Sequence, residues 1–430
     1  MTVTHRRILY GCAFAVFFIT APLLIAYASG YRYDRAGKVL YKTGFLSLGY
    51  STTPDAVLIN GRRVRADGRS LRVGNLAPGS YTVRLEKSGY LPWEQSLTVR
   101  AGAATVVNDI LLFRDASPVL LANKVHTFRV SPDELSIAAL RDTRPFLSVL
   151  SADGGSIVDL QLTSPARSVL WSPDGKRLLV QTTEAWQIFA IDPNAAPTTL
   201  SAPVDTTKAI WDTSDPRRLF LLAGTTLFSA TVSGNAPIAL LSNVVDIAMS
   251  PEGLLALQQE GKGLSLGRVD NGFTVDALFA GSEQAEFLLA ESGVTVVIDR
   301  AKETLWSVDR RSRPFRTMEL EGMTNAAWSP AHRSLAYGND IELYVVSFET
   351  LKTELVSRSG ERLRAFAWLR DLPYLAATRD LRIDILRLSD AGAVSSASLQ
   401  TAHLVSLHPF RRRQAVLLLQ SDGALLKQAY

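Results

Sequence analysis

The sequence predicts a mainly β protein with an N-terminal transmembrane helix, a small β-sandwich and a β-propeller of eight blades, with seven blades as the alternative. Three observations predict this fold class. An uncharged apolar run of 21 residues lies near the N-terminus. Short alternating strands separated by turn residues follow it, and the remaining chain repeats with a period near 40 residues.

Composition places the chain among compact proteins. Apolar residues make up 47% of its 430 residues and charged residues 20%, which is enough to fill two or three cores. Lys and Arg number 46 against 41 Asp and Glu, and they are spread along the chain. Nucleic-acid binders cluster their basic residues, so we expect no nucleic-acid partner. The single cysteine, Cys12, excludes an internal disulfide and a cysteine-based metal cluster.

The apolar run predicts a signal anchor over residues 8–30, preceded by a cytoplasmic tail of residues 1–7. At about 1.5 Å per residue the run crosses a hydrocarbon core of about 30 Å. The alternative is a cleaved signal peptide, because Ala26-Tyr27-Ala28 has the small-x-small form that signal peptidase accepts. The run is longer than the core of a signal peptide, and Tyr31 and Tyr33 suit a membrane interface, so retention is favoured.

Loop charge does not decide the orientation of the anchor. Basic residues flank the run on both sides, namely Arg6, Arg7, Arg32, Arg35 and Lys38. Long following domains tend to be translocated regardless of such charges. We therefore expect a single-pass protein of the cytoplasmic membrane, with its body on the extracytoplasmic side after a linker of residues 31–42.

Residues 43–114 predict a small all-β sandwich. Asn60-Gly61 predicts a type I′ hairpin turn, because both residues tolerate a positive φ. The expected strands are Phe45–Tyr50, Ala56–Ile59, Leu71–Val73, Tyr81–Lys87, Ser96–Val99 and Thr105–Leu112.

This segment resembles the PEGA domain, a small β-sandwich module of bacterial and archaeal surface proteins. The matching motifs are PDAVLING at 54–61, LAPGSYTV at 76–83 and KSGY at 87–90 with Trp93. The first motif lacks the Glu-Gly that the family has between Pro and Ala, and Gly68-Arg69-Ser70 replaces the usual Thr-Pro. The resemblance implies a sandwich fold and a role as a spacer or surface-attachment module.

Five arginines crowd one hairpin of the predicted sandwich and are the candidate binding residues. They are Arg62, Arg63, Arg65, Arg69 and Arg72. One interpretation is a patch that meets anionic envelope polymers or lipid headgroups. The other, which we favour, is a solvated hairpin whose charges keep an edge strand from pairing with a neighbour.

Residues 115–430 contain eight copies of a repeat. Four of them share an apolar residue, Ser-Pro, a polar turn and an apolar strand, as in VLWSPDGKRLLV, and four are weaker copies such as AIWDTSDPRRLFLL. A spacing of 38 to 41 residues, with no helical periodicity, is typical of a four-stranded propeller blade. The last copy has three strands, and residues 118–121 can supply the fourth and close the ring. The fifth copy is weak, which leaves the seven-blade alternative. The anchor positions are Val130, Trp171, Trp211, Met249, Phe287, Trp328, Trp368 and Leu407.

These segments resemble the blade motif of TolB-like and other WD-repeat-like propellers. In this motif Pro ends the inner strand and Asp-Gly forms the tight turn. The preceding Trp packs between neighbouring blades. We therefore assign Trp171, Trp211, Trp328 and Trp368 to the core.

The sequence predicts no catalytic, metal or cofactor site. The histidines, His5, His126, His332, His403 and His408, lack the spacing of a helix-borne metal pair. Arg411-Arg412-Arg413 occupies a hairpin position and is predicted to be a solvated turn. Asp192 and Asp309 close third strands, where we expect them to satisfy turn amides and not to bind Ca²⁺.

The resulting hypothesis is a non-enzymatic, membrane-anchored protein of the cell envelope. Its propeller would bind or scaffold an envelope protein or glycan, with the PEGA-like domain as a spacer or attachment module. The alternative is a propeller hydrolase or lyase that acts on envelope glycans or peptides. Two or more carboxylates or histidines converging at the channel mouth would favour the enzyme.

Overall fold

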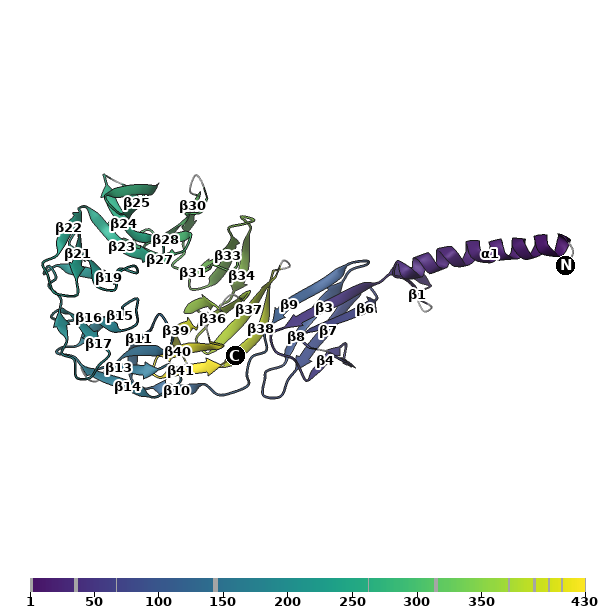
Figure 1. The fold of residues 1–430 in the computed structure, drawn as a ribbon, viewed down its shortest axis with the longest axis horizontal. Coiled ribbons are helices and arrows are strands. Elements are labelled where there is room, and N and C mark those ends of the chain that lie inside the picture. Colours follow the sequence, from purple (N-terminus) through teal and green to yellow (C-terminus); the bar gives the residue numbers. More distant parts are fainter. Residues whose placement is uncertain are drawn as a thin grey trace. The chain divides into compact units, whose positions relative to one another are not determined.

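The computed structural model describes residues 3–34, 38–66, 68–141, 146–261, 263–312, 316–369, 372–389, 392–400, 403–410 and 413–429 (Figure 1). Arg35, Arg411 and Arg412 lie outside these ranges. The chain divides into two compact units between Ala116 and Ser117. The mainly β fold with one N-terminal helix is confirmed.

The N-terminal helix α1 runs from Val3 to Ala28. Its segment Tyr10–Ala28 has a mean hydropathy of 2.0, and none of it is buried by the rest of the protein. The helix ends because Gly30 adopts a left-handed conformation with φ 86°, and its N–H donates to the Tyr27 carbonyl at 3.1 Å. This apolar helix is long enough to be a signal anchor or a membrane span.

The segment expected to be a linker contains a two-stranded antiparallel ribbon of β1 (Tyr31–Asp34) and β2 (Val39–Lys42). No sequence pattern predicted this ribbon, because neither strand alternates between a buried and an exposed face.

The sandwich has two sheets. One contains β6 (Ser70–Leu76), β3 (Gly44–Tyr50) and β9 (Ala104–Ile110), and the other contains β5 (Arg62–Val64), β4 (Ala56–Ile59), β7 (Gly79–Glu86) and β8 (Trp93–Val99). Their inner faces enclose one apolar core that includes Leu46, Val83 and Trp93. Asn60 and Gly61 both have positive φ, 47° and 76°, which confirms the predicted turn.

The described part of Ser117–Ala429 forms eight four-stranded antiparallel sheets, which we number as blades 1 to 8. Blade 1 contains β11 (Val125–Val130), β12 (Ser136–Arg141), β13 (Phe146–Ser151) and β14 (Ser156–Gln161). Blade 2 contains β15 (Ala166–Trp171), β16 (Arg177–Thr182), β17 (Trp186–Ala190) and β18 (Thr198–Thr199). Blade 3 contains β19 (Thr206–Trp211), β20 (Arg218–Ala223), β21 (Thr226–Thr231) and β22 (Ile238–Leu241). Blade 4 contains β23 (Val244–Ser250), β24 (Gly253–Glu260), β25 (Gly263–Val269) and β26 (Phe273–Phe279).

The second half of the ring repeats the same order. Blade 5 contains β27 (Ala285–Glu291), β28 (Val294–Asp299), β29 (Thr304–Asp309) and β30 (Arg316–Glu321). Blade 6 contains β31 (Asn325–Ser329), β32 (Ser334–Gly338), β33 (Glu342–Ser347) and β34 (Thr353–Arg358). Blade 7 contains β35 (Ala365–Trp368), β36 (Tyr374–Thr378), β37 (Arg382–Ser389) and β38 (Gly392–Gln400). Blade 8 contains β39 (Leu404–Pro409), β40 (Ala415–Gln420), β41 (Leu425–Ala429) and β10 (Val119–Ala122). The weak fifth repeat thus forms a complete blade.

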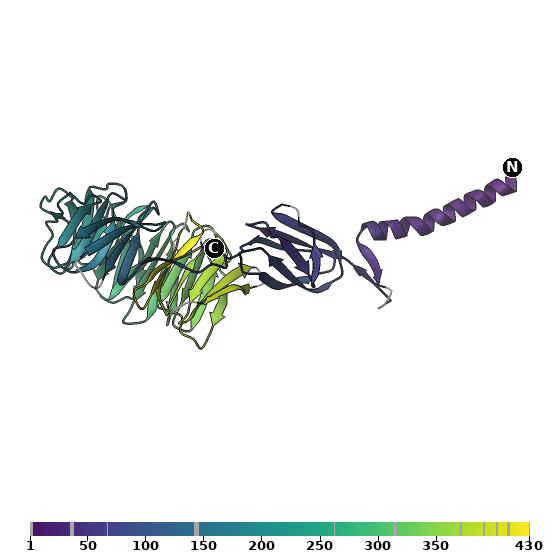
Figure 2. The same cartoon turned by 90° about the horizontal axis from the view of Figure 1, so that it is seen from below.

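Strand β10 closes the ring, as predicted, by pairing with β41 so that Leu120 lies opposite Leu426. One apolar cluster then joins the first and last blades, with Phe128 and Leu150 packed in the same cluster as Leu417. The first strand of each blade lies innermost and the last outermost. Figure 2 shows the strands running across the thickness of the ring.

The repeated Trp and Ser-Pro-Asp-Gly positions have the structural roles predicted for them. Trp211 and Trp368 are buried between blades, and Trp171 and Trp328 are half-buried. The Nε1–H of Trp368 donates to the Ala327 carbonyl of the preceding blade at 3.0 Å, and Trp171 makes the equivalent bond to Arg129 at 2.9 Å.

The Ser172-Pro-Asp-Gly turn shows how the motif stabilises itself. The hydroxyl of Ser172 donates to Asp174 Oδ1 at 2.6 Å, and the Lys176 amide donates to the same oxygen at 3.1 Å. Gly175 has φ 67°, which an L side chain tolerates poorly. Burial opposes ionisation of Asp174, but these hydrogen bonds outweigh it and hold the pKa of the carboxyl below its usual value.

Candidate functional site

The innermost strands line a central channel with two different mouths. Neighbouring innermost strands contact one another around the ring, as β23 contacts β27 and β35 contacts β39. Because every blade repeats the same strand order, these strands run in the same direction. The channel therefore has one mouth where they end and another where they begin.

The mouth at which the innermost strands end is apolar. A cavity of about 520 Å³ lies there, and its lining comes from β15, β19, β23 and β27 of four successive blades. We call this the apolar mouth and define it by the half-buried side chains of Leu170, Trp171, Ile210, Ala248 and Leu289. Apolar side chains that remain accessible to solvent from four strands at once form a concave surface suited to an apolar ligand segment.

One ion pair spans the blades beside this mouth. Lys208 Nζ lies 2.8 Å from Asp246 Oδ1, and the Phe287 amide donates to Asp246 Oδ2 at 2.7 Å. Asp246 is only 6% exposed, so its charge is matched by a lysine of blade 3 and a backbone donor of blade 5. The carboxylate thus holds three successive innermost strands together.

The mouth at which the innermost strands begin is charged in blades 6 to 8. A cavity of about 510 Å³ is lined there by Asp340, Arg362, Arg364, Asp380 and His403, which we call the charged mouth. Arg362 Nε lies 2.8 Å from Asp340 Oδ2, and Arg364 Nε lies 2.8 Å from Asp380 Oδ1. Each carboxylate is therefore paired with a guanidinium group, whereas a glycosidase presents two carboxyl groups across an open substrate position.

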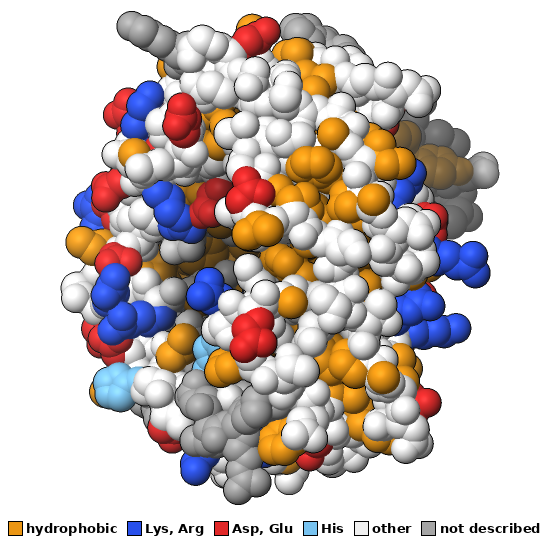
Figure 3. Space-filling model, turned by 90° about the vertical axis from the view of Figure 1, so that its left-hand side faces the viewer, with side chains coloured by type: hydrophobic (Ala, Val, Ile, Leu, Met, Phe, Trp, Pro, Cys, Tyr) orange, Lys and Arg blue, Asp and Glu red, His pale blue; other side chains and the backbone are white. Residues whose placement is uncertain are grey.

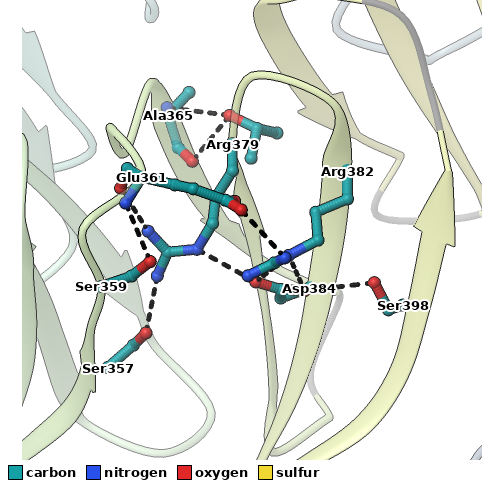
Figure 4. Close-up of polar contacts among 9 residues, drawn as sticks. Ser357, Ser359, Glu361, Ala365, Arg379, Arg382, Asp384 and Ser398 are labelled. Atoms are coloured by element: carbon teal, nitrogen blue, oxygen red, sulfur yellow. Dashed lines mark hydrogen bonds and ion pairs between the residues drawn. The ribbon is translucent and has the colours of Figure 1, made fainter.

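A buried polar network fixes the loop that carries Arg362 and Arg364 (Figure 4). The side chain of Arg379, 1% exposed, donates from Nε to Asp384 Oδ2 at 3.0 Å. Its two other nitrogens donate to the Glu361 carbonyl at 2.9 Å and to Ser357 Oγ at 2.7 Å. Arg379 therefore links blade 6, the loop between the blades and β37 of blade 7, and it acts on the charged mouth through that loop.

The five candidate arginines do not lie on one hairpin, which corrects the prediction. Arg62 and Arg63 are on β5, the edge of one sheet, whereas Arg72 is on β6, the edge of the other. Arg65 and Arg69 lie in the crossing between the sheets. Strand β5 is only three residues long. After it the chain crosses to the other sheet, where β6 pairs with β3.

All five arginines are exposed. Arg63 donates to the Asp55 carbonyl at 2.8 Å, and Arg72 lies 5.8 Å from the Phe45 ring centroid. The three on edge strands, Arg62, Arg63 and Arg72, are placed to protect sheet edges from pairing with a neighbour.

His403 and His408 are separated by most of one strand. His403 precedes β39, while His408 lies near the end of that strand against the rings of Phe128 and Phe410. Within the described residues no group of three or more His, Cys, Asp or Glu could hold a metal ion.

Two predictions about turns have different outcomes. Asp192 and Asp309 accept turn amides of Asn194 and Arg311 at 2.9 and 3.0 Å, as predicted. Arg413 is not a solvated turn residue, because it forms an ion pair with Asp153 of blade 1 across the ring closure. Asp153 also lies 3.0 Å from Lys427 of blade 8, and the hydrogen bond from Lys427 holds the pKa of Asp153 below its usual value.

Sequence reasoning missed the charged groups at both mouths, although the repeat period contains a signal for them. Asp340 and Asp380 are 40 residues apart, one repeat, and both follow a second strand. Lys208 and Asp246 each lie three residues before a repeat anchor. Charged residues at one register of adjacent blades are therefore candidates for pairing around the channel.

The outer rim also exposes apolar side chains. Ile238 and Leu240 on β22 and Val275 and Leu278 on β26 are exposed on the outermost strands of two adjoining blades. On the face shown in Figure 3, apolar side chains lie among scattered charges and inside a hollow. The rim therefore offers further contact area besides the channel.

Residues 54–111 match the family model of the PEGA domain, which confirms the resemblance seen in the sequence. The chain therefore combines a PEGA domain with a β-propeller and an N-terminal apolar helix. No curated protein matches the sequence.

Two solved structures are similar to about three quarters of this chain. The β-propeller domain of Cps50 (Swd1) from Myceliophteria thermophila is 11% identical with a TM-score of 0.45, and the alignment covers 73% of this chain and 98% of that one. A chain of the Mitotic Checkpoint Complex is 14% identical with a TM-score of 0.43, covering 74% and 90%. The fold assignment rests on the strand pairing described above and not on these similarities.

Proposed function

We propose that the protein is a non-enzymatic binding platform, held at the cytoplasmic membrane by α1, whose propeller binds another envelope protein on the extracytoplasmic side. The PEGA domain would act as a spacer or attachment module between the anchor and the propeller. The observation that carries the proposal is the apolar mouth, where four successive innermost strands leave apolar side chains accessible. A site of this kind gains binding energy from apolar burial, which suits a protein segment better than a glycan.

The membrane anchor is supported by the length and surface of α1. Its 19-residue apolar segment spans about 28 Å at 1.5 Å per residue, close to the thickness of a hydrocarbon core. None of that segment is buried within the protein. Insertion into a bilayer would therefore cover the apolar surface that the rest of the protein leaves exposed.

The absence of enzymatic activity is supported by the pairing at the charged mouth. Asp340 and Asp380 line the same cavity, which is the convergence that would favour a hydrolase or lyase, but an arginine engages each of them. The arrangement supports recognition of charged groups better than acid–base catalysis, which requires a carboxyl group within reach of a substrate proton.

Photo-crosslinking of the full-length protein in cells of its native host tests the proposal. A photoreactive residue at Leu289, in the apolar mouth, is expected to give a discrete protein adduct, and one at Val405, in the charged mouth, is not. Ala248→Asp places a charge in the apolar mouth, so it is expected to abolish the adduct. Adducts that persist in Ala248→Asp, or that consist of glycan, would overturn the proposal. Turnover of envelope glycans or peptides by the purified protein would support the enzyme instead.

A further inference from the structure

The ribbon of β1 and β2 follows the anchor helix after two residues and presents a distinctive face. Directly opposite residues of an antiparallel pair share a face. The register pairs Tyr31 with Lys42 and Tyr33 with Leu40, so these four side chains lie together. Tyr33 is 59% and Leu40 60% exposed, and Tyr31 and Lys42 are exposed too. The face is thus aromatic and aliphatic with one cation.

A two-stranded ribbon in water is marginally stable, because it has no second layer against which to bury a face. In this ribbon the side chains of Tyr33 and Leu40 on one face are exposed, and so is Val39 on the other face. Tyrosines with an adjacent lysine are typical of the membrane–water interface, where the rings lie at headgroup depth and the ammonium group meets phosphate.

The base of the ribbon is fixed to the helix end and to the sandwich. The Gly30 carbonyl accepts from both the amide and the hydroxyl of Thr43, at 2.8 and 2.9 Å. Arg32 donates to the Tyr27 carbonyl at 2.8 Å and lies 3.8 Å from the Tyr27 ring centroid. Its other terminal nitrogen donates to Asn75 Oδ1 at 3.0 Å. The ribbon therefore cannot turn freely about the end of the helix.

We propose that this ribbon lies in the headgroup layer of the membrane, with Tyr31, Tyr33 and Leu40 facing the lipid and Lys42 facing anionic headgroups. It would set the depth of the anchor and the orientation of the PEGA domain above the bilayer. The proposal rests on the proposed retention of α1 as a membrane anchor. The partner is a lipid surface, because the ribbon continues directly from the apolar helix and its exposed groups match interfacial chemistry.

The test uses the full-length chain reconstituted in vesicles that contain anionic phospholipid, with one polarity-sensitive fluorophore per molecule. In a Cys12→Ser background, single cysteines replace Tyr33, Leu40 or Ser88. Ser88 is an exposed residue next to Asp55, at the end of the sandwich away from Gly30. Labels at 33 and 40 are expected to show blue-shifted emission and quenching by lipids that carry a nitroxide near the headgroup. The label at 88 is expected to remain unquenched.

The native cysteine separates failure of this proposal from failure of the anchor. Cys12 is exposed on α1 and reports insertion when labelled. Quenching at 12 with none at 33 or 40 would overturn the ribbon proposal and leave the anchor standing. No quenching at 12 would overturn both.

A charge variant supplies a second readout. Leu40→Glu is expected to abolish the quenching of a label at 33, whereas Ser88→Glu leaves it unchanged. Equal quenching in the two variants would contradict the proposed contact.

Discussion

Removal of the Asp384 carboxylate should destabilise the propeller far more than removal of a neighbouring exposed carboxylate. Arg379 is 1% exposed and Asp384 16%, so Asp384→Ala leaves a buried guanidinium group without its counter-charge. Breaking one partner of a buried pair costs about 3–5 kcal/mol. Because Asp384 is slightly exposed, we expect the lower end, about 3 kcal/mol, and a fall in melting temperature of about 6 °C.

The matched control is Asp380→Ala. Asp380 pairs with Arg364 at 2.8 Å, but both side chains are more than a third exposed, so its loss should cost under about 1 kcal/mol. Thermal unfolding of the full-length protein in detergent, followed by tryptophan fluorescence, measures both. Arg379→Met combined with Asp384→Ala should be more stable than Asp384→Ala alone, because the unpaired charge is gone. Equal melting temperatures for the two single variants would refute the reasoning.

Three further predictions concern the ring closure, the blade motif and the sandwich turn. The pKa of Asp153 is lowered in the folded state by Lys427, so its contribution to stability is present above the unfolded pKa of about 3.9 and is lost as pH falls through the folded value. Asp153→Asn should therefore flatten the acid side of the curve of stability against pH. An unchanged curve would contradict the stabilising role of the Asp153–Lys427 pair. Trp368→Phe should lower the free energy of unfolding, measured in urea, by about 1 kcal/mol more than Trp211→Phe does. The two residues are similarly buried, but of these two only Trp368 donates a hydrogen bond to a carbonyl among the described contacts. Gly61→Ala should cost about 1 kcal/mol because φ is 76°, while Gly74→Ala, at an ordinary φ with open space, should be neutral or stabilising; equal effects would argue against the turn assignment.

Local chemistry explains what the sequence predicted well. The Ser-Pro-Asp-Gly turn satisfies its own polar groups, as Ser172 and Asp174 show, so related Ser-Pro turns recur in several blades. Trp368 donates to the carbonyl of Ala327, which lies 41 residues earlier in the preceding blade. A contact of this kind favours a Trp at the same position of several repeats, so the repeat period can be recognised in the sequence. Because the last repeat lacked one strand, the leftover segment before the first repeat had to supply it.

Tertiary placement explains what the sequence could not predict. Strand β5 is three residues long and mostly exposed, so no alternation marks it, and the arginines that flank it appeared to share one hairpin. The contact of Arg379 with Ser357 joins residues 22 apart through the packing of two blades. Such contacts depend on how sheets pack, which local patterns do not encode.

The central channel and its two mouths require a closed ring of blades, because an open arc does not enclose a channel. The most direct test is a disulfide between Leu120→Cys and Leu426→Cys in a Cys12→Ser background, because these residues lie opposite each other in β10 and β41. The structure predicts an intrachain disulfide under mild oxidation. The off-register pair Leu120→Cys and Gln428→Cys should form none, because bridging requires Cα atoms within about 7 Å. Absence of the intrachain bond in the first pair, or equal yields in both, would contradict the closed ring.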